Sequence, residues 1–286
     1  MAVTGRLPDF IVAGVRKCGT TWLDQCLREH PGIYLPTVTK EIFYFDRYFA
    51  RGDDWYGAYF DGAAAGQVVG EVSPTYFVSP DAPDRILATV PKAKLVFVFR
   101  EPVARVVSLY HHMRSKGDTS LSLSDAVEEL PELLEEGFYA RHLAHYRAVF
   151  PHENLLPLLV DDVQSPAPLF RFLGVDASFE PPSLRGRSYE RREARSHALA
   201  RFAAGTSRFL HSAGLHGAVK FAKRLGAEKV VLREKAASSE PIDPAIAARL
   251  YALYDDDIKR LGDMMGRDLR KVWNMDAAQA GGGTRE

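Results

Sequence analysis

The sequence has little cysteine, no net charge and no long uninterrupted apolar stretch. Its two cysteines, Cys18 and Cys26, fall in one expected loop and in the helix after it, which argues against a mutual disulfide and suits a reducing compartment. Lysine plus arginine number 37, as do aspartate plus glutamate, so no overall field attracts nucleic acid or an anionic membrane. No segment approaches the roughly 20 apolar residues of a membrane span, and no signal-like segment precedes Phe10. We therefore expect a cytoplasmic protein whose anion sites are local.

Apolar spacing along the 286 residues indicates alternating strands and helices. Strands are predicted at residues 10–13, 68–72, 94–99 and 155–160. Helices are predicted at residues 20–28, 81–90, 102–114, 123–130, 138–149 and 242–265. This alternation predicts a three-layer α/β/α fold with a central parallel sheet and a helical carboxyl-terminal region. We expect one domain over residues 1–275, with an irregular, arginine-rich candidate lid at about 183–240 and a disordered tail at 276–286.

A basic, glycine-containing turn follows the first predicted strand, with the residues Gly14-Val15-Arg16-Lys17-Cys18-Gly19-Thr20-Thr21-Trp22. The order of strand, glycine loop and helix presents backbone N–H groups and a positive helix end to an anion. Gly14 and Gly19 are spaced as in a Walker A loop, but Thr20 stands where that loop has its lysine, and the lysine comes earlier as Lys17. The turn therefore predicts a phosphate site that lacks the Walker coupling of lysine to a magnesium-binding hydroxyl.

A second polar motif begins where the predicted strand 94–99 ends, in Arg100-Glu101-Pro102, and continues to Ser108. Pro102 suits the first turn of a helix, so Arg100 would lie at the strand end and Ser108 about two turns into the helix. Ligands of open α/β sheets bind in the crevice at the carboxyl ends of the strands. A planar guanidinium and a hydroxyl there suit a phosphate. Together with the first loop, the motif indicates a ligand with two separated anionic groups.

These residues resemble the sulfotransferases that use 3′-phosphoadenosine 5′-phosphosulfate (PAPS), in particular their bacterial and carbohydrate (heparan-sulfate-type) branch. The first loop looks like the family's 5′-phosphosulfate loop, and Arg100 with Ser108 looks like its 3′-phosphate motif. Two further segments are similar to family elements, Lys40-Glu41-Ile42-Phe43-Tyr44-Phe45-Asp46 and Glu71-Val72-Ser73-Pro74-Thr75-Tyr76. The resemblance is dense over residues 8–175 and afterwards consists of an ending, residues 266–273, that is common in bacterial members.

The resemblance implies in-line transfer of a sulfuryl group from PAPS to a hydroxyl of a small-molecule, carbohydrate or lipid acceptor. Lys17 would neutralise the leaving bridging oxygen, and Glu41 would act as general base on the acceptor hydroxyl. No metal is required, because loop amides and cationic side chains stabilise the charge. The donor would be bound by Arg16, Lys17, Cys18, Gly19, Thr20, Thr21, Trp22, Arg100 and Ser108.

Several of these residues also have a plain structural interpretation. Lys17 alone would be a solvated loop lysine, and Arg100 alone a strand-end partner of Glu101 or Asp84. Trp22 on the inner side of a first helix is as often a core residue as a wall for adenine. The segments that carry the two phosphate motifs occur together in the expected order, and this combination favours the functional interpretation.

The base segment and its neighbours leave more alternatives. Glu41 would otherwise pair with Lys40 or Arg47, and Cys18 in a helix-opening turn would otherwise be a low-pKa nucleophile. His111 and His112 follow the Ser108 turn, where they would act on the acceptor or lie in solvent.

Two broader segments stay open as well. The arginines of 185–195 would form a lid over an anion or a solvated segment, and the aromatics of 55–60 would line an acceptor cleft or fill the core.

Two departures from the family pattern narrow the expected acceptor. Val72 stands where glycosaminoglycan-type enzymes carry a lysine, and Phe43 or Tyr44 replaces a histidine often found in the base segment. Both changes argue against a heparan-type acceptor. The lack of an amino-terminal membrane anchor favours a bacterial-style enzyme over a Golgi enzyme.

Two other classes of function share the loop. A P-loop NTPase or small-molecule kinase needs a lysine and a hydroxyl residue directly after Gly19, where Thr20 counts against it, and an acidic residue after a later strand, for which Asp161 and Asp162 are candidates. A non-catalytic nucleotide-binding protein would keep the loop and need no base.

Overall fold

The computed structural model describes residues 5–162, 165–185, 192–194, 232–234 and 242–275. Most of the expected lid (183–240) and the whole expected tail (276–286) lie outside these residues, so both assignments stay predictions. The lid's described part includes β6 (Arg192–Ala194) and β7 (Leu232–Glu234), which pair as antiparallel strands. Among the described residues, no helix combines the length and apolarity that crossing a membrane requires.

Five parallel strands form the central sheet in the order β2-β3-β1-β4-β5. The strands are β1 (Phe10–Gly14), β2 (Ile33–Tyr34), β3 (Val68–Val72), β4 (Lys94–Phe99) and β5 (Leu155–Leu159). The four strands predicted from apolar runs are confirmed, because strands buried on both faces read as continuous apolar segments. The prediction missed β2, whose two residues are too few to form a pattern.

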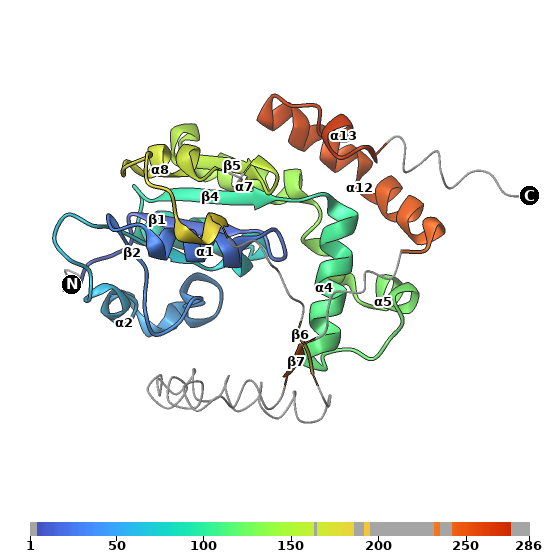
Figure 1. Ribbon diagram of the computed structural model, residues 1–286, viewed down its shortest axis with the longest axis horizontal. Helices are drawn as coiled ribbons and strands as arrows, with labels where there is room; N and C mark the ends of the chain where they lie inside the picture. Colours follow the sequence, from blue (N-terminus) through green and yellow to red (C-terminus); the bar gives the residue numbers. More distant parts are fainter. Residues whose placement is uncertain (1–4, 163–164, 186–191, 195–231, 235–241, 276–286) are drawn as a thin grey trace, which may run out of the picture.

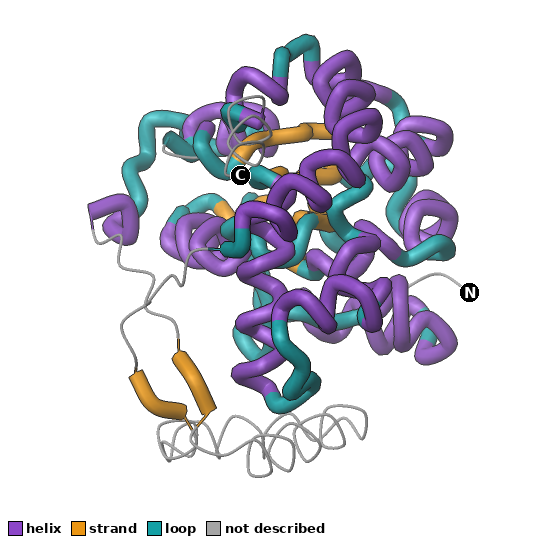
Figure 2. Tube along the Cα trace, turned by 90° about the vertical axis from the view of Figure 1, so that its right-hand side faces the viewer, coloured by secondary structure: helices purple, strands orange, loops and turns teal. Residues whose placement is uncertain are grey.

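Helices cover both faces of this sheet, and Figures 1 and 2 show the strands enclosed between them. The α-helices of the described residues are α1 (Thr20–Glu29), α2 (Asp53–Gly57), α3 (Ala82–Thr89), α4 (Pro102–Lys116), α5 (Leu123–Glu129), α6 (Pro131–Glu135), α7 (Tyr139–Val149), α8 (Ala167–Leu173), α12 (Pro244–Met265) and α13 (Leu269–Val272). The three-layer α/β/α fold is therefore confirmed, as is the helical carboxyl-terminal region.

The side chains of β4 decide how α7 is placed. Phe97 contacts Tyr146 of α7 with ring centroids 4.8 Å apart, and Phe99 contacts Tyr139 at 5.0 Å. Alternate residues of a strand face opposite sides, so Val96 points to the other helical layer. Aromatic edge contacts of this kind add about 0.5–1.5 kcal/mol each to the burial of apolar surface. The packing fixes the first turn of α7 beside the carboxyl end of β4.

The carboxyl-terminal helix α12 is joined to α7 by a buried carboxylate. Asp257 is 3% exposed and accepts hydrogen bonds from the backbone N–H groups of Ala140 (2.8 Å) and Arg141 (3.0 Å). These N–H groups belong to the first turn of α7, which has no partner for them within the helix. Figure 1 shows α12 beside α7, outside the sheet. A segment more than a hundred residues away thus completes the start of α7.

Residues 44–60 fold into short helical turns whose aromatic side chains fill the core. Tyr44 stacks on Tyr56 at 4.3 Å, and Tyr56 and Phe60 are buried. Their interpretation as core residues is therefore confirmed, whereas Trp55 and Tyr59 are only partly buried.

Candidate active site

The loop between β1 and α1 has a shape that depends on its two glycines. A Cβ at Gly14 would lie 2.8 Å from the side chain of Phe77, so a side chain there would force the loop away from its neighbour. Gly19 has φ +84°, and Lys17 adopts a positive φ of 68°. Only glycine reaches this region without strain, so Gly19 permits the sharp entry into α1. The predicted turn is thus confirmed as a tight loop with Lys17 near its middle.

The first turn of α1 suits a negatively charged group. Thr20 is the first residue of the helix and is buried, and Thr21 is exposed beside it. Within the described part of the chain, no side chain caps this helix and no acidic residue lies in its first turn. The first backbone N–H groups of a helix have no acceptor within the helix, and they carry a partial positive charge. The residues present therefore fit the 5′-phosphosulfate group that the resemblance implies.

The second predicted motif meets this loop directly. Arg100, the residue after β4, donates a long hydrogen bond from Nη1 to the backbone oxygen of Lys17 (3.5 Å). The Tyr139 hydroxyl donates to the backbone oxygen of Arg100 (2.9 Å), which holds the strand end in place. Ser108 follows on α4, half-exposed and two turns from its start. The structure therefore brings Arg100 and Lys17 together, and Ser108 lies on the helix that continues from Arg100.

Glu101 has a different role from the one considered for it. Its carboxylate accepts hydrogen bonds from the backbone N–H groups of Val103 (2.7 Å) and Ala104 (2.6 Å) at the start of α4. It therefore acts as the helix cap, which leaves the guanidinium of Arg100 directed to the Lys17 loop.

Buried charged residues pack against the loop between β1 and α1 and stabilise it. Arg16 forms an ion pair through Nε with Glu136, which is 1% exposed. Burial raises the pKa of Glu136, while the charges of Arg16 and the fully buried Arg105 oppose that rise. Arg105 also donates to the backbone oxygen of Leu133 (2.7 Å). The sequence did not reveal this support, because Glu136 is separated from Arg16 by 120 residues.

Cys18 belongs to the same support. Its thiol is buried near the Tyr139 hydroxyl (3.9 Å), and its backbone N–H donates to the oxygen of Val15 (3.3 Å). Burial raises the pKa of the thiol to about 12, so it stays neutral near pH 7. The alternative of a low-pKa nucleophile is therefore wrong. Cys18 and Cys26 are both free, as expected.

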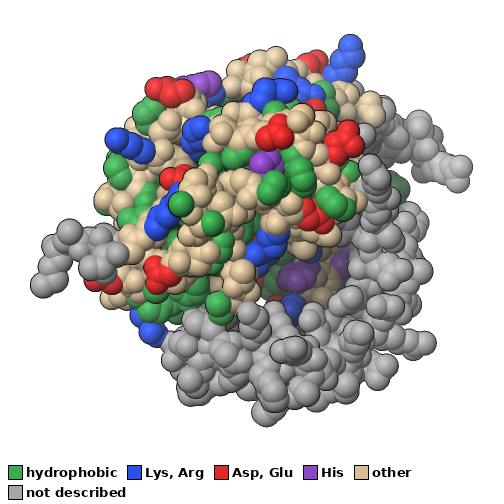
Figure 3. All heavy atoms as spheres, turned by 60° about the vertical axis from the view of Figure 1, so that its left-hand side comes forward, with side chains coloured by type: hydrophobic (Ala, Val, Ile, Leu, Met, Phe, Trp, Pro, Cys, Tyr) green, Lys and Arg blue, Asp and Glu red, His purple; other side chains and the backbone are tan. Residues whose placement is uncertain are grey.

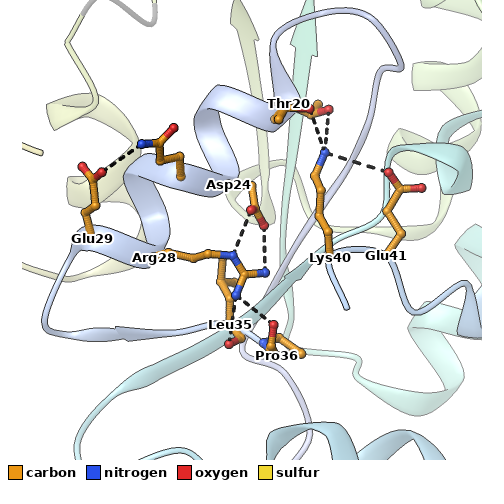
Figure 4. Close-up of polar contacts among 10 residues, drawn as sticks. Thr20, Asp24, Arg28, Glu29, Leu35, Pro36, Lys40 and Glu41 are labelled. Carbon is orange, nitrogen blue, oxygen red and sulfur yellow. Dashed lines mark hydrogen bonds and ion pairs between the residues drawn. The ribbon is translucent and has the colours of Figure 1, made fainter. Parts of the chain in front are cut away.

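The candidate base segment folds against the first turn of α1. Figure 4 shows Lys40 between the Thr20 hydroxyl and the carboxylate of Glu41. The Lys40 Nζ lies 3.5 Å from Thr20 Oγ1, 3.4 Å from Thr21 Oγ1 and 3.9 Å from Glu41 Oε1. Burial raises the pKa of Glu41, and the charges of Lys40 and then Arg16 oppose this. Glu41 thus lies beside the first turn of α1, in the loose ion pair with Lys40 that the plain interpretation anticipated.

A buried hydrogen-bond network fixes this segment to the end of β3. Glu71, which is fully buried, accepts from the Tyr56 hydroxyl (2.8 Å) and from Ser73 Oγ (3.1 Å). Ser73 Oγ in turn accepts from the backbone N–H of Ile42 (3.3 Å), the residue after Glu41. Burial raises the pKa of Glu71 to about 7, although its hydrogen bonds oppose this. Glu71 has no exposed surface to offer an acceptor, so it supports the site from within.

The remaining candidates lie around this centre. Trp22 is partly buried against the core, and His111 and His112 lie on α4. Asp162, considered for magnesium, forms an ion pair with Arg267, and it follows β5 at the sheet edge rather than a strand beside β1. The side chains of the arginine run 185–195 lie outside the described residues. Figure 3 shows cationic and anionic side chains interspersed on one face, as zero net charge suggests.

A parallel sheet with a glycine-containing loop after its central strand and an arginine at the neighbouring strand end defines an open α/β protein whose ligand crevice lies at the carboxyl ends of the strands. Comparison with known families identifies that class further. The chain belongs to the sulfotransferase family, since the family model described as "Sulfotransferase domain" matches residues 7–178.

Individual relatives agree with this family. The chain is 41% identical over 108 residues to the membrane-associated sulfotransferase kil1 of Dictyostelium discoideum, covering 37% of this chain and 23% of that protein. It is 35% identical over 159 residues to heparan sulfate glucosamine 3-O-sulfotransferase 6 of Homo sapiens, covering 53% and 46%. The chain thus spans less than half the length of these curated relatives.

A solved structure with the same fold supports the architecture. The crystal structure of a sulfotransferase from Alicyclobacillus acidocaldarius aligns with a TM-score of 0.69 at 23% identity, over 94% of this chain and 99% of that one.

Proposed function

We propose that this protein transfers a sulfuryl group from PAPS to a hydroxyl group of an acceptor by in-line displacement. The observation that carries the proposal is the contact between Arg100 Nη1 and the backbone oxygen of Lys17 (3.5 Å). It joins the two phosphate-binding motifs at the carboxyl ends of adjacent strands, as a donor with two separated anionic groups requires. Membership of the sulfotransferase family supports the same reaction.

The chain's own residues would divide the binding of the donor between two ends. PAPS supplies the sulfuryl group and a phosphate leaving group. Thr20, Thr21 and the first N–H groups of α1 hold the 5′-phosphate, while Arg100 and Ser108 hold the 3′-phosphate. Lys17 stabilises the negative charge that grows on the bridging oxygen. Arg16, Cys18 and Gly19 shape the loop, and Trp22 borders it.

Glu41 is the general base of the proposal. It accepts the proton of the acceptor hydroxyl as that oxygen attacks, for which the carboxylate has to be ionised. Burial raises its pKa, so activity falls as the pH drops through that raised value. No metal ion takes part in this scheme, because cationic side chains and backbone amides stabilise the charge.

The acceptor is a hydroxyl of a carbohydrate, a lipid or another small molecule. Val72 at the end of β3 is 1% exposed and offers no cation to an anionic sugar chain, which favours acceptors without dense negative charge. We also propose a cytoplasmic location, which the two free thiols, Cys18 and Cys26, support.

Calorimetry with 3′,5′-adenosine bisphosphate tests the donor. We expect binding in the micromolar range or tighter that is the same with magnesium and with a chelator. Preference for Mg-ATP would instead identify a kinase. A mass-shift screen of hydroxyl compounds for added sulfate then separates an enzyme from a nucleotide-binding protein.

Lys17→Ala tests the chemical role within this scheme. The variant is expected to keep bisphosphate binding within about tenfold, because a single charged contact is lost, and to lose turnover almost completely. A rate within a factor of about three of the native rate would remove Lys17 from the mechanism.

A further inference from the structure

A second lysine, Lys40, lies beside the loop proposed to bind the donor, and the proposed mechanism assigns no role to it. Lys40 Nζ lies 3.4 Å from Thr21 Oγ1 and 3.5 Å from Thr20 Oγ1, the two hydroxyls proposed to hold the 5′-phosphate. Its third neighbour is Glu41 Oε1 at 3.9 Å. Figure 4 shows the Lys40 side chain reaching across to α1, with Glu41 beside it. The ammonium group therefore lies between the donor loop and the candidate base.

Hydrogen bonds attach the chain segment before Lys40 to α1 and so fix the position of the Lys40 backbone. Arg28 of α1 donates from Nη1 to the backbone oxygens of Pro36 (2.8 Å) and Leu35 (3.4 Å). Asp24, one turn earlier, holds the same guanidinium with bonds of 2.9 and 3.1 Å. The carboxylate of Asp24 is thus committed to Arg28 rather than to Lys40, and Glu41 is the carboxylate paired with Lys40 among the described residues.

The surroundings of Lys40 favour an additional anion. Its side chain is 25% exposed, and burial lowers its pKa, against the charges of Glu41 and Asp24. The two hydroxyl contacts are long and the ion pair is loose, so the charge is only partly compensated. An oxyanion that accepts hydrogen bonds from Thr20 and Thr21 would come within reach of the same ammonium group.

We propose that Lys40 binds the 5′-phosphosulfate end of the donor together with Thr20 and Thr21, and that the same ammonium group orients Glu41. This inference rests on the proposed sulfotransferase function and adds a donor-binding residue to it. Lys40 then links the two substrates, because one charge contacts the donor and the base that serves the acceptor. Binding of the donor draws the lysine charge partly away from Glu41, which makes the carboxylate a stronger base when the donor is present.

The charges around Glu41 set the direction of the expected pH effect. They are Lys40, Arg16 and Arg47, which lower its pKa, and Asp46, which raises it. Arg16 is bound to Glu136, and Arg47 lies over the Phe43 ring and beside Asp46. Lys40 is first among the charges that oppose the effect of burial. Its removal should therefore raise the pKa of Glu41.

The experiment compares Lys40→Met, Lys40→Arg and the control Lys92→Met, which alters an exposed lysine between α3 and β4 at the opposite edge of the sheet. Calorimetry with 3′,5′-adenosine bisphosphate and the KM for PAPS should show affinity about 10- to 100-fold weaker in Lys40→Met. Lys40→Arg should stay within about threefold of the native protein, since it keeps the charge. The acidic limb of the kcat/KM profile should move up by about one pH unit or more in Lys40→Met.

The outcomes separate this inference from the function on which it rests. If the native protein binds no bisphosphate and transfers no sulfate, the proposed function fails. If the native protein does both and Lys40→Met equals Lys92→Met in affinity and pH profile, the role of Lys40 is refuted. An equal loss in Lys40→Arg and Lys40→Met would also refute it, because the effect would then not depend on charge.

Discussion

Replacement of Glu71 by glutamine should stabilise the protein relative to the native chain, and this gain in stability should be larger at high pH than at low pH. Glu71 is fully buried, and its pKa rises from an ordinary value of 4.5 to about 7. A carboxyl with a raised folded-state pKa favours the folded state when protonated, and stability falls as the pH rises through this window. Relative to a side chain that never ionises, Glu71 then lowers the free energy of unfolding by about 3 kcal/mol at pH 8 but only about 1 kcal/mol at pH 5.

Glutamine has the same shape and never ionises, so it avoids this cost. Its amide oxygen still accepts from the Tyr56 hydroxyl, and its NH₂ group can donate to Ser73 Oγ. The free energy of unfolding of Glu71→Gln minus that of the native protein should therefore increase by about 2.5 kcal/mol from pH 5 to pH 8. Taking the difference at each pH cancels the titration of all other groups.

Urea unfolding at pH 5, 6, 7 and 8, followed by circular dichroism, measures this difference. The control Glu132→Gln alters an exposed carboxylate on α6 and should change by less than about 0.5 kcal/mol over the same range. Parallel curves for the native protein and Glu71→Gln would refute the reasoning, because the pKa of Glu71 would then be nearly the same in the folded and unfolded states.

Two further predictions concern the proposed reaction. Glu41→Gln should lower kcat by about 10²–10⁴-fold in assays of sulfate transfer and leave bisphosphate binding, measured by calorimetry, within about threefold of the native value. A large loss of bisphosphate binding would instead indicate that Glu41 has a structural role. Arg100→Ala should weaken the binding of 3′,5′-adenosine bisphosphate by about 10- to 100-fold. The binding of adenosine 5′-phosphate should be weakened far less. Equal losses for both nucleotides in competition assays would contradict a contact between Arg100 and the 3′-phosphate.

The sequence predicted the parts of the fold whose pattern is local. Strands 68–72 and 94–99 were predicted with their observed bounds, and the helix at Pro244–Met265 nearly so, since buried strands and amphipathic helices have characteristic spacing. Residues 44–60 were not predicted, because their short turns are held by aromatic packing between residues far apart in the chain. A pattern that depends on tertiary contacts leaves no periodic signal.

The candidate site, too, has features that a local sequence pattern predicts and features that depend on tertiary contacts. Lys17 and Arg100 were predicted to lie at one edge of the sheet, because each follows a parallel strand and the carboxyl ends of such strands share that edge. Their direct contact was not predicted. The place of Lys40 depends on how residues 31–40 turn back onto α1, which Arg28 decides through backbone oxygens rather than through a motif. The sequence identified Glu71 as part of a motif, but only the structure shows that Glu71 is buried and is linked to Ile42 through Ser73.

The bond between Asp257 and the start of α7 bears on where this protein can be divided. The family match ends at residue 178, yet the N–H groups of Ala140 and Arg141 find their acceptor on α12. Tyr139, one residue earlier, holds the backbone of Arg100. A recombinant fragment trimmed to the matched residues would leave these N–H groups without their carboxylate and would loosen the backbone around Arg100, the residue proposed to bind the 3′-phosphate. The unit that folds and the unit that sequence comparison detects therefore have different boundaries.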